Sequence, residues 1–532
     1  MNLDFVSPRL LDYIFFVGSL KPDPNSPTRN PSILLKRFPQ NDHKDFPVQN
    51  EIVNFCQPDG CIILPKSQLP IHSPISFIFT LTDKDSGKVR YGICLNFYRQ
   101  IIIDNKDYLT LTSICLISHH NYFSKFRKII SLLKNVIFSS IDRLSLNDFW
   151  DVFFNSNEIQ MAEFGVLSLI ESIESWILRL LSAPIPIQGK TIISIKAFGD
   201  DQTTSETIDF AMPGKTRLSL IDFPLHLPLE LLSLEICIKL LTAIMLEHKI
   251  IVQSRDYNAL SMTVMALVKL LYPLQYMFPV IPLLPTTLAS AEQLLLSPTP
   301  FIIGIPSSFL PSKSNFTLPN DVWLIDIDSN EILQENKTER LYNFPEPECQ
   351  ILISHLKQVL ADICPEGNID QGNYLFESDI NTKDIDTIDV ATRVAMVRFF
   401  NSTNILANFT EFTSIIRLYP RPVVAFHQRS FIKSHENLCD FTKRFIRTQA
   451  VEYLAEWCLM PKNEVFQRIH AGITDPKIIG DKSKWYQNDL LKIDFAIIDG
   501  ITNEPVLIWL KKIWPNQAFE INEQQKEVFH QK

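Results

Sequence analysis

Short apolar runs separated by polar turns occupy the N-terminal part of the chain. The runs at residues 75–81 and 90–103 flank a polar stretch that contains Gly87, which is the pattern of a β-hairpin. The apolar spacing then becomes helical and predicts a helix over residues 122–137. Further strands are predicted at residues 10–17, 33–38 and 109–117. A meander of strands closed by a helix indicates one α/β module.

The middle of the chain is its most apolar region. Residues 229–248 are hydrophobic on most faces and predict one buried helix, and the β-branched run 249–253 predicts a strand. A second helix is predicted over residues 259–271, where Pro273 stops it. Further strand-like runs lie at residues 278–284, 301–305 and 322–327. Strands that alternate with helices favour packed α/β layers.

The last third of the chain is predicted to be mainly helical. Helices are expected at residues 390–412, 441–459 and 463–470, and an earlier one at 158–181. The segment 139–156 is predicted to be a connector, and the polar segment 364–386 a surface loop. The pattern fades after residue 480. We therefore expect truncation after residue 486 to leave the melting of the helical part unchanged.

Composition and charge exclude several classes of protein. The 532 residues are 46% hydrophobic and 20% charged, so the chain can build a sizeable core and is not disordered throughout. The net charge of −9 lacks the basic footprint of nucleic-acid binding. No signal peptide is predicted, because Asp4, Pro8 and Arg9 interrupt any apolar N-terminal stretch. The most membrane-like stretch, residues 264–284, contains Lys269 and three prolines, so no transmembrane segment is predicted.

The candidate chemistry is mostly negative. The nine cysteines are widely spaced with no CxxC pair, which favours a reducing compartment and predicts neither a disulfide framework nor a metal site. Cys56 and Cys61 bracket a Gln-Pro-Asp-Gly turn and are predicted to be buried thiols. Gly189-Lys190-Thr191 ends like a phosphate-binding loop, but the required first glycine falls on Pro184. Because GxSxG and HExxH are also absent from the sequence, no catalytic residue is predicted.

Two polar clusters have two interpretations each. Glu247 and His248 fit an acid/base pair, or else a helix C-terminus followed at residues 255–258 by a turn that caps the next helix. The cations between Arg429 and Arg447 fit contact with anionic lipid headgroups, or else a solvated helix face. The second interpretation is favoured in both cases.

Several long strings resemble the DENN family. Three strings resemble the upstream part of a DENN module: LKRFP at 35–39, DHKDFP at 42–47 and FCQPDGC at 55–61. The string LEHKIIVQSR at 246–255 resembles the central DENN signature, and DFPLHLPLE at 222–230 and YMFPVIP at 276–282 lie around it. The string VATRVAMVRFF at 390–400 resembles the downstream part. This resemblance covers nearly all of residues 1–486. It implies an α/β tripartite DENN module, with an N-terminal longin-like lobe and a C-terminal α/β lobe that has a helical downstream part.

The domain boundaries follow from the resemblance and the patterns together. We expect an upstream module at residues 1–140, a central module at 155–345, a downstream helical module at 346–480 and an unassigned tail at 481–532. Members of the family usually extend further, so the chain is expected to be a fragment, a short isoform or an incomplete gene model. Death-domain-type partners are therefore not carried over.

The resemblance implies guanine-nucleotide exchange on a Rab-family small GTPase in vesicle trafficking and regulated secretion. The expected partner is the GDP-bound or nucleotide-free Rab, with no cofactor, no metal and no nucleic acid. The location implied is the cytoplasm, with peripheral contact to a vesicle or the plasma membrane. The alternative is a non-catalytic trafficking adaptor that binds a GTPase or cargo. Exposed candidates for the GTPase interface, beside the central signature, are Arg255, Asp256 and Asn258.

Overall fold

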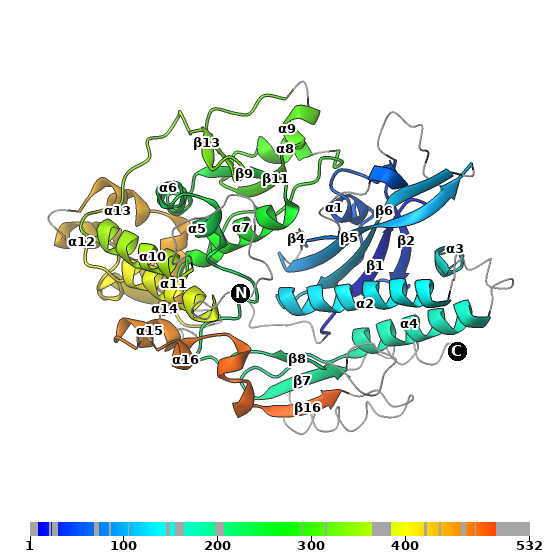
Figure 1. Ribbon diagram of the computed structural model, residues 1–532. Helices are drawn as coiled ribbons and strands as arrows, with labels where there is room; N and C mark the ends of the chain where they lie inside the picture. The colour runs from blue at the N-terminus through cyan, green and yellow to red at the C-terminus, as the bar shows by residue number, and fades with distance from the viewer. Residues whose placement is uncertain are drawn as a thin grey trace. The chain divides into compact units, whose positions relative to one another are not determined.

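The chain folds into two compact units, here called unit 1 (Met1–Met212 and Gln487–Lys532) and unit 2 (Pro213–Tyr486). The computed structural model is shown in Figure 1. It describes residues 9–495 except 21–22, 24–29, 69–73, 84–86, 105, 145–148, 155–163, 197–206, 290, 314–315, 364–384, 420–422, 436–437, 459–463 and 474. The predicted loop at 364–386 lies almost wholly outside the described residues.

Unit 1 is built on an antiparallel sheet whose strands, except the short β3, are the predicted ones. Its order is β2-β1-β6-β5-β4, and β3 pairs with β6 as well. The strands are β1 (Tyr13–Gly18), β2 (Ile33–Phe38), β3 (Ile63–Pro65), β4 (Ile75–Thr82), β5 (Val89–Ile103) and β6 (Lys106–Ser118). The predicted hairpin is confirmed, because β4 and β5 pair from Ile75 opposite Asn96 to Thr82 opposite Val89. The short helix α1 (Ile52–Cys56) contacts β6.

Helix α2 (Phe123–Leu144) packs on β5 and β6, as its apolar spacing predicts. Phe126, Ile130 and Leu133 are all fully buried on its inner side. The prediction of a connector at 139–156 is wrong, because this segment holds the end of α2 and all of α3 (Phe149–Phe154). The ring of Phe153 is buried and meets Phe16 of β1 edge-on at 5.1 Å. Helix α4 (Phe164–Ser182) follows and contacts both α2 and α3.

A second, three-stranded sheet of unit 1 joins distant parts of the sequence. Its order is β16-β7-β8, formed by β7 (Thr191–Lys196), β8 (Thr207–Ala211) and β16 (Leu491–Phe495) (Figure 1). Strand β16 runs parallel to β7, with Leu491 opposite Thr191. Structure therefore continues past residue 480, where the sequence pattern fades.

Unit 2 contains a five-stranded sheet of order β10-β11-β9-β12-β13. Strands β9, β10, β11 and β12 are parallel and β13 is antiparallel to β12. The strands are β9 (Lys249–Ser254), β10 (Val280–Ile281), β11 (Ile302–Pro306), β12 (Val322–Asp326) and β13 (Glu331–Gln334). Helices α6 (Leu234–Met245) and α7 (Tyr257–Leu270) pack against β9, so the mixed α/β class is confirmed.

Two of the long predicted helices are each divided in two. The run 229–248 forms α5 (Leu227–Leu231) and α6, because the Ser233 hydroxyl accepts a hydrogen bond from the N–H of Ile236 and begins a new helix. The run 441–459 likewise forms α13 (Asp440–Phe445) and α14 (Gln449–Cys458). The predicted helix at 390–412 is instead α11 (Ile385–Phe400), followed after a turn by the 3₁₀ helix η3 (Phe409–Phe412).

The remaining elements of unit 2 are short except for one helix. They are α8 (Ala291–Leu295), α9 (Phe309–Ser312), α10 (Glu348–Ile363), β14 (Thr413–Arg417), β15 (Val423–Phe426), α12 (Gln428–Ser434), α15 (Glu464–His470) and α16 (Pro476–Ile479). Among the described helices, none combines the length and the apolar character that crossing a bilayer requires.

Candidate functional site

The carboxyl ends of three parallel strands in unit 2 place the predicted site residues. Strands β9, β11 and β12 end in register, with Ser254 opposite Pro306 and Gln253 opposite Asp326. Ligands of open α/β sheets commonly bind at this edge. Asp328 joins the ends of β9 and β12, because its carboxylate accepts from the hydroxyl of Ser254 at 2.7 Å and from the N–H of Arg255 at 2.9 Å.

Of the three predicted interface residues, Arg255 is the one that solvent reaches freely. Its side chain is 81% exposed, although its Nε donates to Asp328 at 3.1 Å. The side chain of Asp256 caps α7 by accepting from the N–H groups of Asn258 and Ala259 at 2.7 and 3.2 Å. Asn258 is half-buried in the first turn of that helix. The favoured interpretation of residues 255–258 as a capping turn is confirmed, and the interface role stays a prediction.

Glu247 and His248 have structural partners. Glu247 adopts a left-handed φ of 62°, and its carboxylate accepts from the N–H groups of Gln449 and Ala450 at the start of α14. The indole of Trp323 donates to Nδ1 of the buried His248 at 3.2 Å, and burial lowers the pKa of this histidine. No nucleophilic hydroxyl or thiol among the described residues bonds to His248. These contacts fit the helix-end interpretation.

The string DFPLHLPLE contacts the buried carboxylate of Asp389. Asp389 Oδ1 accepts from the N–H groups of Leu225 and His226, both at 3.1 Å, and lies 2.7 Å from Nδ1 of His226. Burial alone would lower the pKa of His226, but the contact with Asp389 raises it. Asp389 belongs to α11, so this carboxylate fixes the entry to α5 against the helical part of the unit.

Four residues extend this contact into what we call the unit 2 ion network: Arg393, Asp481, Lys482 and Asp389. Arg393 Nη1 donates to Asp481 at 2.8 Å, and the two side chains are 2% and 1% exposed. Lys482 Nζ lies 3.6 Å from Asp389 and donates to the carbonyl of Ile221 at 2.7 Å. Sequence reasoning missed Asp481 and Lys482, because they follow the point where apolar periodicity ends.

A comparable set in unit 1, the unit 1 ion network, consists of Arg9, Asp12, Asp45 and Arg90. Asp12 is buried between two guanidinium groups, at 2.8 Å from Arg90 Nε and 3.0 Å from Arg9 Nε. Asp45, from the string DHKDFP, accepts from Arg9 Nη2 at 2.7 Å and remains 47% exposed. Asp45 also accepts from Arg90 Nη2 at 3.3 Å, so this string ties the loop after β2 to β5.

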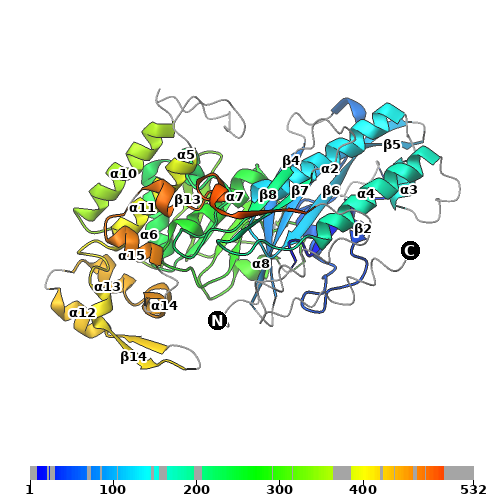
Figure 2. The same cartoon turned by 90° about the horizontal axis from the view of Figure 1, so that it is seen from below.

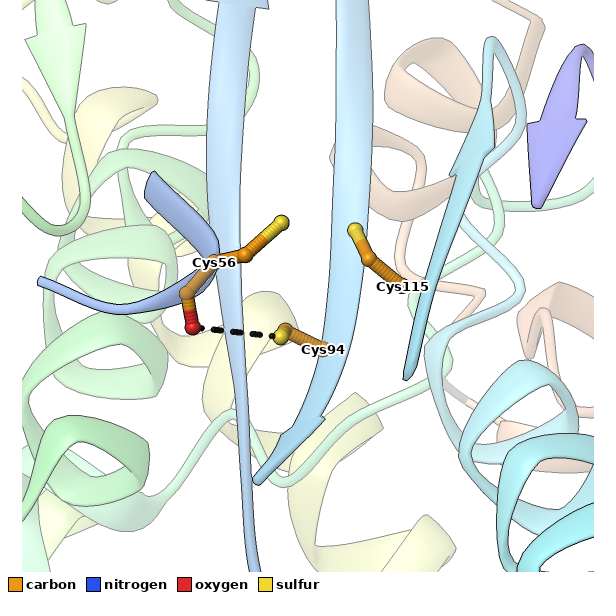
Figure 3. Close-up of side chains that lie close together, drawn as sticks. All are labelled: Cys56, Cys94 and Cys115. Atoms are coloured by element: carbon orange, nitrogen blue, oxygen red, sulfur yellow. Dashed lines mark hydrogen bonds between the residues drawn. The ribbon is translucent and has the colours of Figure 1, made fainter. Parts of the chain in front are cut away.

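The donor set that best matches a metal site is a cluster of three fully buried cysteines in unit 1. The sulfurs of Cys56, Cys94 and Cys115 lie within 4.8 Å of one another (Figure 3). Soft thiolates suit Zn²⁺ or Cu⁺. Burial raises the pKa of Cys94 and Cys115. Burial also acts to raise the pKa of Cys56, but hydrogen bonds with the other two thiols outweigh it and lower this pKa. Because all three sulfurs are enclosed and burial raises the pKa of two of them, we favour thiols packed as small apolar groups over a bound metal ion. The predicted burial of Cys56 and Cys61 is confirmed.

Comparison with known families identifies the modules that carry these strings. The uDENN domain model matches residues 32–97, and the DENN (AEX-3) domain model matches residues 109–330. The chain is a DENN-domain protein. The family resemblance of the upstream and central strings is thereby confirmed, while the string at 390–400 lies outside both matches. The uDENN match lies in unit 1, while the DENN match begins in β6 and continues through the parallel sheet of unit 2.

The chain matches part of the length of several longer relatives. It is 40% identical to the MAP kinase-activating death domain protein of Mus musculus, over 93% of the chain and 37% of that relative. The protein of the same name in Caenorhabditis elegans is 42% identical, over 92% and 37%. The DENN domain-containing protein 2C of Homo sapiens is 25% identical, over 82% and 41%. The chain thus spans little more than a third of the length of these two MAP kinase-activating death domain proteins.

Proposed function

We propose that this chain is a guanine-nucleotide exchange factor that promotes GDP release and GTP loading on a Rab-family small GTPase, in vesicle trafficking or regulated secretion. The observation that carries the proposal is the joint uDENN and DENN match, in a chain 40–42% identical to two relatives over nearly all its own length. The absence of a nucleophile–base pair from the described sites accords with this proposal, because exchange breaks no covalent bond.

The proposed mechanism is thermodynamic linkage. A GTPase holds its nucleotide through its phosphate-binding loop and Mg²⁺. A protein that binds the nucleotide-free form more tightly than the loaded form must weaken nucleotide binding by the same factor. The chain therefore needs contacts that differ between the two states of the switch regions. We expect it to prefer GDP-bound or nucleotide-free Rab, and to work in the cytoplasm or at a membrane surface.

Within unit 2 we propose the edge formed by Arg255, Asp256 and Asn258 as part of the GTPase interface. The 81% exposure of Arg255 supports a contact role, because its guanidinium retains free donors beyond the bond to Asp328. Asp256 and Asn258 act in this proposal through the capped start of α7, which holds Arg255 in place. A carboxylate on the GTPase surface is the expected partner of Arg255.

Release of fluorescent GDP from a panel of purified Rabs tests the proposal. The full chain should accelerate release from at least one Rab, and Arg255→Glu should reduce that acceleration at least tenfold without shifting the melting temperature. Lys239→Glu is the control, because Lys239 is also a cation of unit 2 paired with a carboxylate, that of Glu235 at 3.1 Å, and its side chain is 42% exposed. Acceleration of no Rab, with selective capture of GTP-bound Rab, would replace exchange by the adaptor function.

A further inference from the structure

A β-hairpin with exposed apolar side chains extends from the helical part of unit 2. It is formed by β14 and β15, which pair from Thr413 opposite Phe426 to Arg417 opposite Val423. Figure 2 shows β14 extending away from α12 and α13. Four large side chains along its outer part are exposed: Ile415 by 51%, Ile416 by 68%, Leu418 by 68% and Tyr419 by 86%. A run of adjacent exposed apolar side chains marks an interaction site more often than scattered ones do.

The base of the hairpin is fixed, in contrast to this outer part. Phe431 of α12 is fully buried and contacts Phe412 and Phe426 at centroid distances of 5.3 and 5.6 Å. At the base of the hairpin, the N–H of His427 donates to the carbonyl of Phe412 at 2.8 Å. Strand β15 also contacts α14. The apolar side chains are therefore held outward by a packed support.

The exposure of consecutive residues decides what kind of medium covers these side chains. The register of β14 shifts between Ile415 and Arg417, so regular alternation does not assign Ile416 to a face. Every residue from Ser414 to Tyr419 is nevertheless exposed, so neither face of this segment is covered. A partner protein that packs on one face would leave the other face in water. A medium that surrounds the strand covers both, and the acyl boundary of a lipid layer is such a medium.

The charges next to the hairpin are basic, although the whole chain is acidic. Arg417 ends β14, and Arg429 and Lys433 lie one turn apart on α12. All three are exposed, and no carboxylate in the described part of the chain pairs with them. Among the described residues, the exposed acidic residues nearest in sequence are Glu411 of η3 and Asp440 of α13, and Asp440 pairs with Lys443 at 3.2 Å. Basic residues beside an apolar end complement an anionic membrane surface.

We propose that the exposed apolar side chains of Ile415, Ile416, Leu418 and Tyr419 insert into the interfacial layer of a membrane that contains anionic lipids, while Arg417, Arg429 and Lys433 contact the headgroups. Tyr419, with an apolar ring and a polar hydroxyl, suits the headgroup level. The hairpin would hold the chain at a membrane surface, and this inference does not depend on the proposed exchange activity.

Flotation of the full chain with vesicles tests the proposal. Vesicles of phosphatidylcholine with 30% phosphatidylserine, a composition chosen at about physiological charge, should carry the chain, and pure phosphatidylcholine vesicles should carry it much less. The double variant Ile416→Ser with Leu418→Ser should lower partitioning at least tenfold, because two large apolar side chains are removed. Ile102→Ser is the matched control, since Ile102 is 71% exposed at the end of β5, beside Asp104 and Asp107.

Two more variants separate insertion from simple charge attraction. Arg429→Ala with Lys433→Ala should weaken binding about fivefold per cation, on the anionic vesicles alone. Tyr419→Trp should add fluorescence that brominated lipids quench, beyond the quenching of the native tryptophans. Equal flotation of the double serine variant, an equal loss in the Ile102 control, or loss of self-association in place of vesicle binding would each overturn the proposal. Equal melting temperatures establish that every variant is folded.

Discussion

The two ion networks differ in how far water reaches them. In unit 1, Asp12 is buried between two arginines, but Asp45 at the edge of the network is 47% exposed. In unit 2, Arg393 and Asp481 are both almost fully buried, and Lys482 and Asp389 lie beside them with little exposure. Removing one partner from an enclosed pair leaves an uncompensated charge, whereas water can replace a partner at an exposed edge. The same kinds of residue should therefore stabilise the two units by different amounts.

The largest effect is expected for Arg393→Met. It leaves Asp481 buried without its guanidinium, which should lower the free energy of unfolding by about 3–5 kcal/mol. Urea unfolding followed by circular dichroism measures this change. Arg398→Met is the control, because Arg398 lies on the same helix and is exposed. A loss below about 1 kcal/mol would show that the unit 2 network contributes little.

Asp12→Asn should have a smaller effect in unit 1. Arg9 and Arg90 both keep contacts with Asp45, at 2.9 and 3.3 Å, but lose the charged partner of their bonds to Asp12 at 3.0 and 2.8 Å. We expect a loss of about 1.5–3 kcal/mol, the range for hydrogen bonds to charged groups. The exposed pair Lys66–Asp107 provides the control Asp107→Asn, which should cost less than about 1 kcal/mol. An Asp12 effect as large as that of Arg393→Met would remove the contrast between the networks.

Opposite pH dependence is the next expectation for His226 of unit 2 and for His43 and His119 of unit 1. Despite burial, Asp389 raises the pKa of His226, so its contribution to unit 2 is full below the unfolded pKa of about 6.5 and is lost as pH rises through the folded value. In unit 1, burial and then the charge of Arg9 lower the pKa of His43. Burial and then the charge of Arg90 lower the pKa of His119. Their contribution is present above about 6.5 and is lost as pH falls.

Histidine variants make this pH contrast measurable. Between pH 5.5 and 8.5 the destabilisation caused by His226→Asn should shrink, while that caused by His119→Asn should grow. Thermal melts across this range, each compared with the unchanged chain at the same pH, test both directions. Parallel trends for the two variants would contradict the assignment of opposite shifts.

The smallest effect is expected in the cysteine cluster. Cys115→Val replaces a fully buried thiol by an apolar side chain of similar size, so it should cost less than about 1.5 kcal/mol if the thiols are protonated. Metal analysis of the purified chain and of this variant provides the accompanying measurement. Stoichiometric zinc or copper that the substitution removes would show that the cluster is a metal site.

Local pattern predicted the strands of unit 1 well, because each strand carries its own apolar alternation. Strand β2 covers the predicted residues 33–38, and β4 and β5 form the predicted hairpin. The division at Ser233 was missed because uniformly apolar flanks hide a helix start. Strand β16 was missed because its partner, β7, lies about 300 residues earlier, and parallel pairing leaves no local turn signal.

The candidate site was predictable in part for the same reason. The sequence indicated the turn at residues 255–258, since an Asp before a helical run is a cap signal. It did not indicate Asp328, which lies 73 residues beyond Arg255 and fixes that turn from the segment after β12. The expectation that truncation after residue 486 has no effect now concerns unit 2 alone, because β16 belongs to unit 1. Truncation after 480 would also remove Asp481 and Lys482 from the unit 2 network.

The pairing of β16 with β7 sets an order of events during synthesis. When β7 and β8 leave the ribosome, the strand that completes their sheet has not been translated, because all of unit 2 is encoded between them. At 5–20 residues per second, these roughly 280 intervening residues take about 15–55 s. During this interval β7 presents an unpaired edge to the cell, and a nascent chain in that state is a natural client for chaperones.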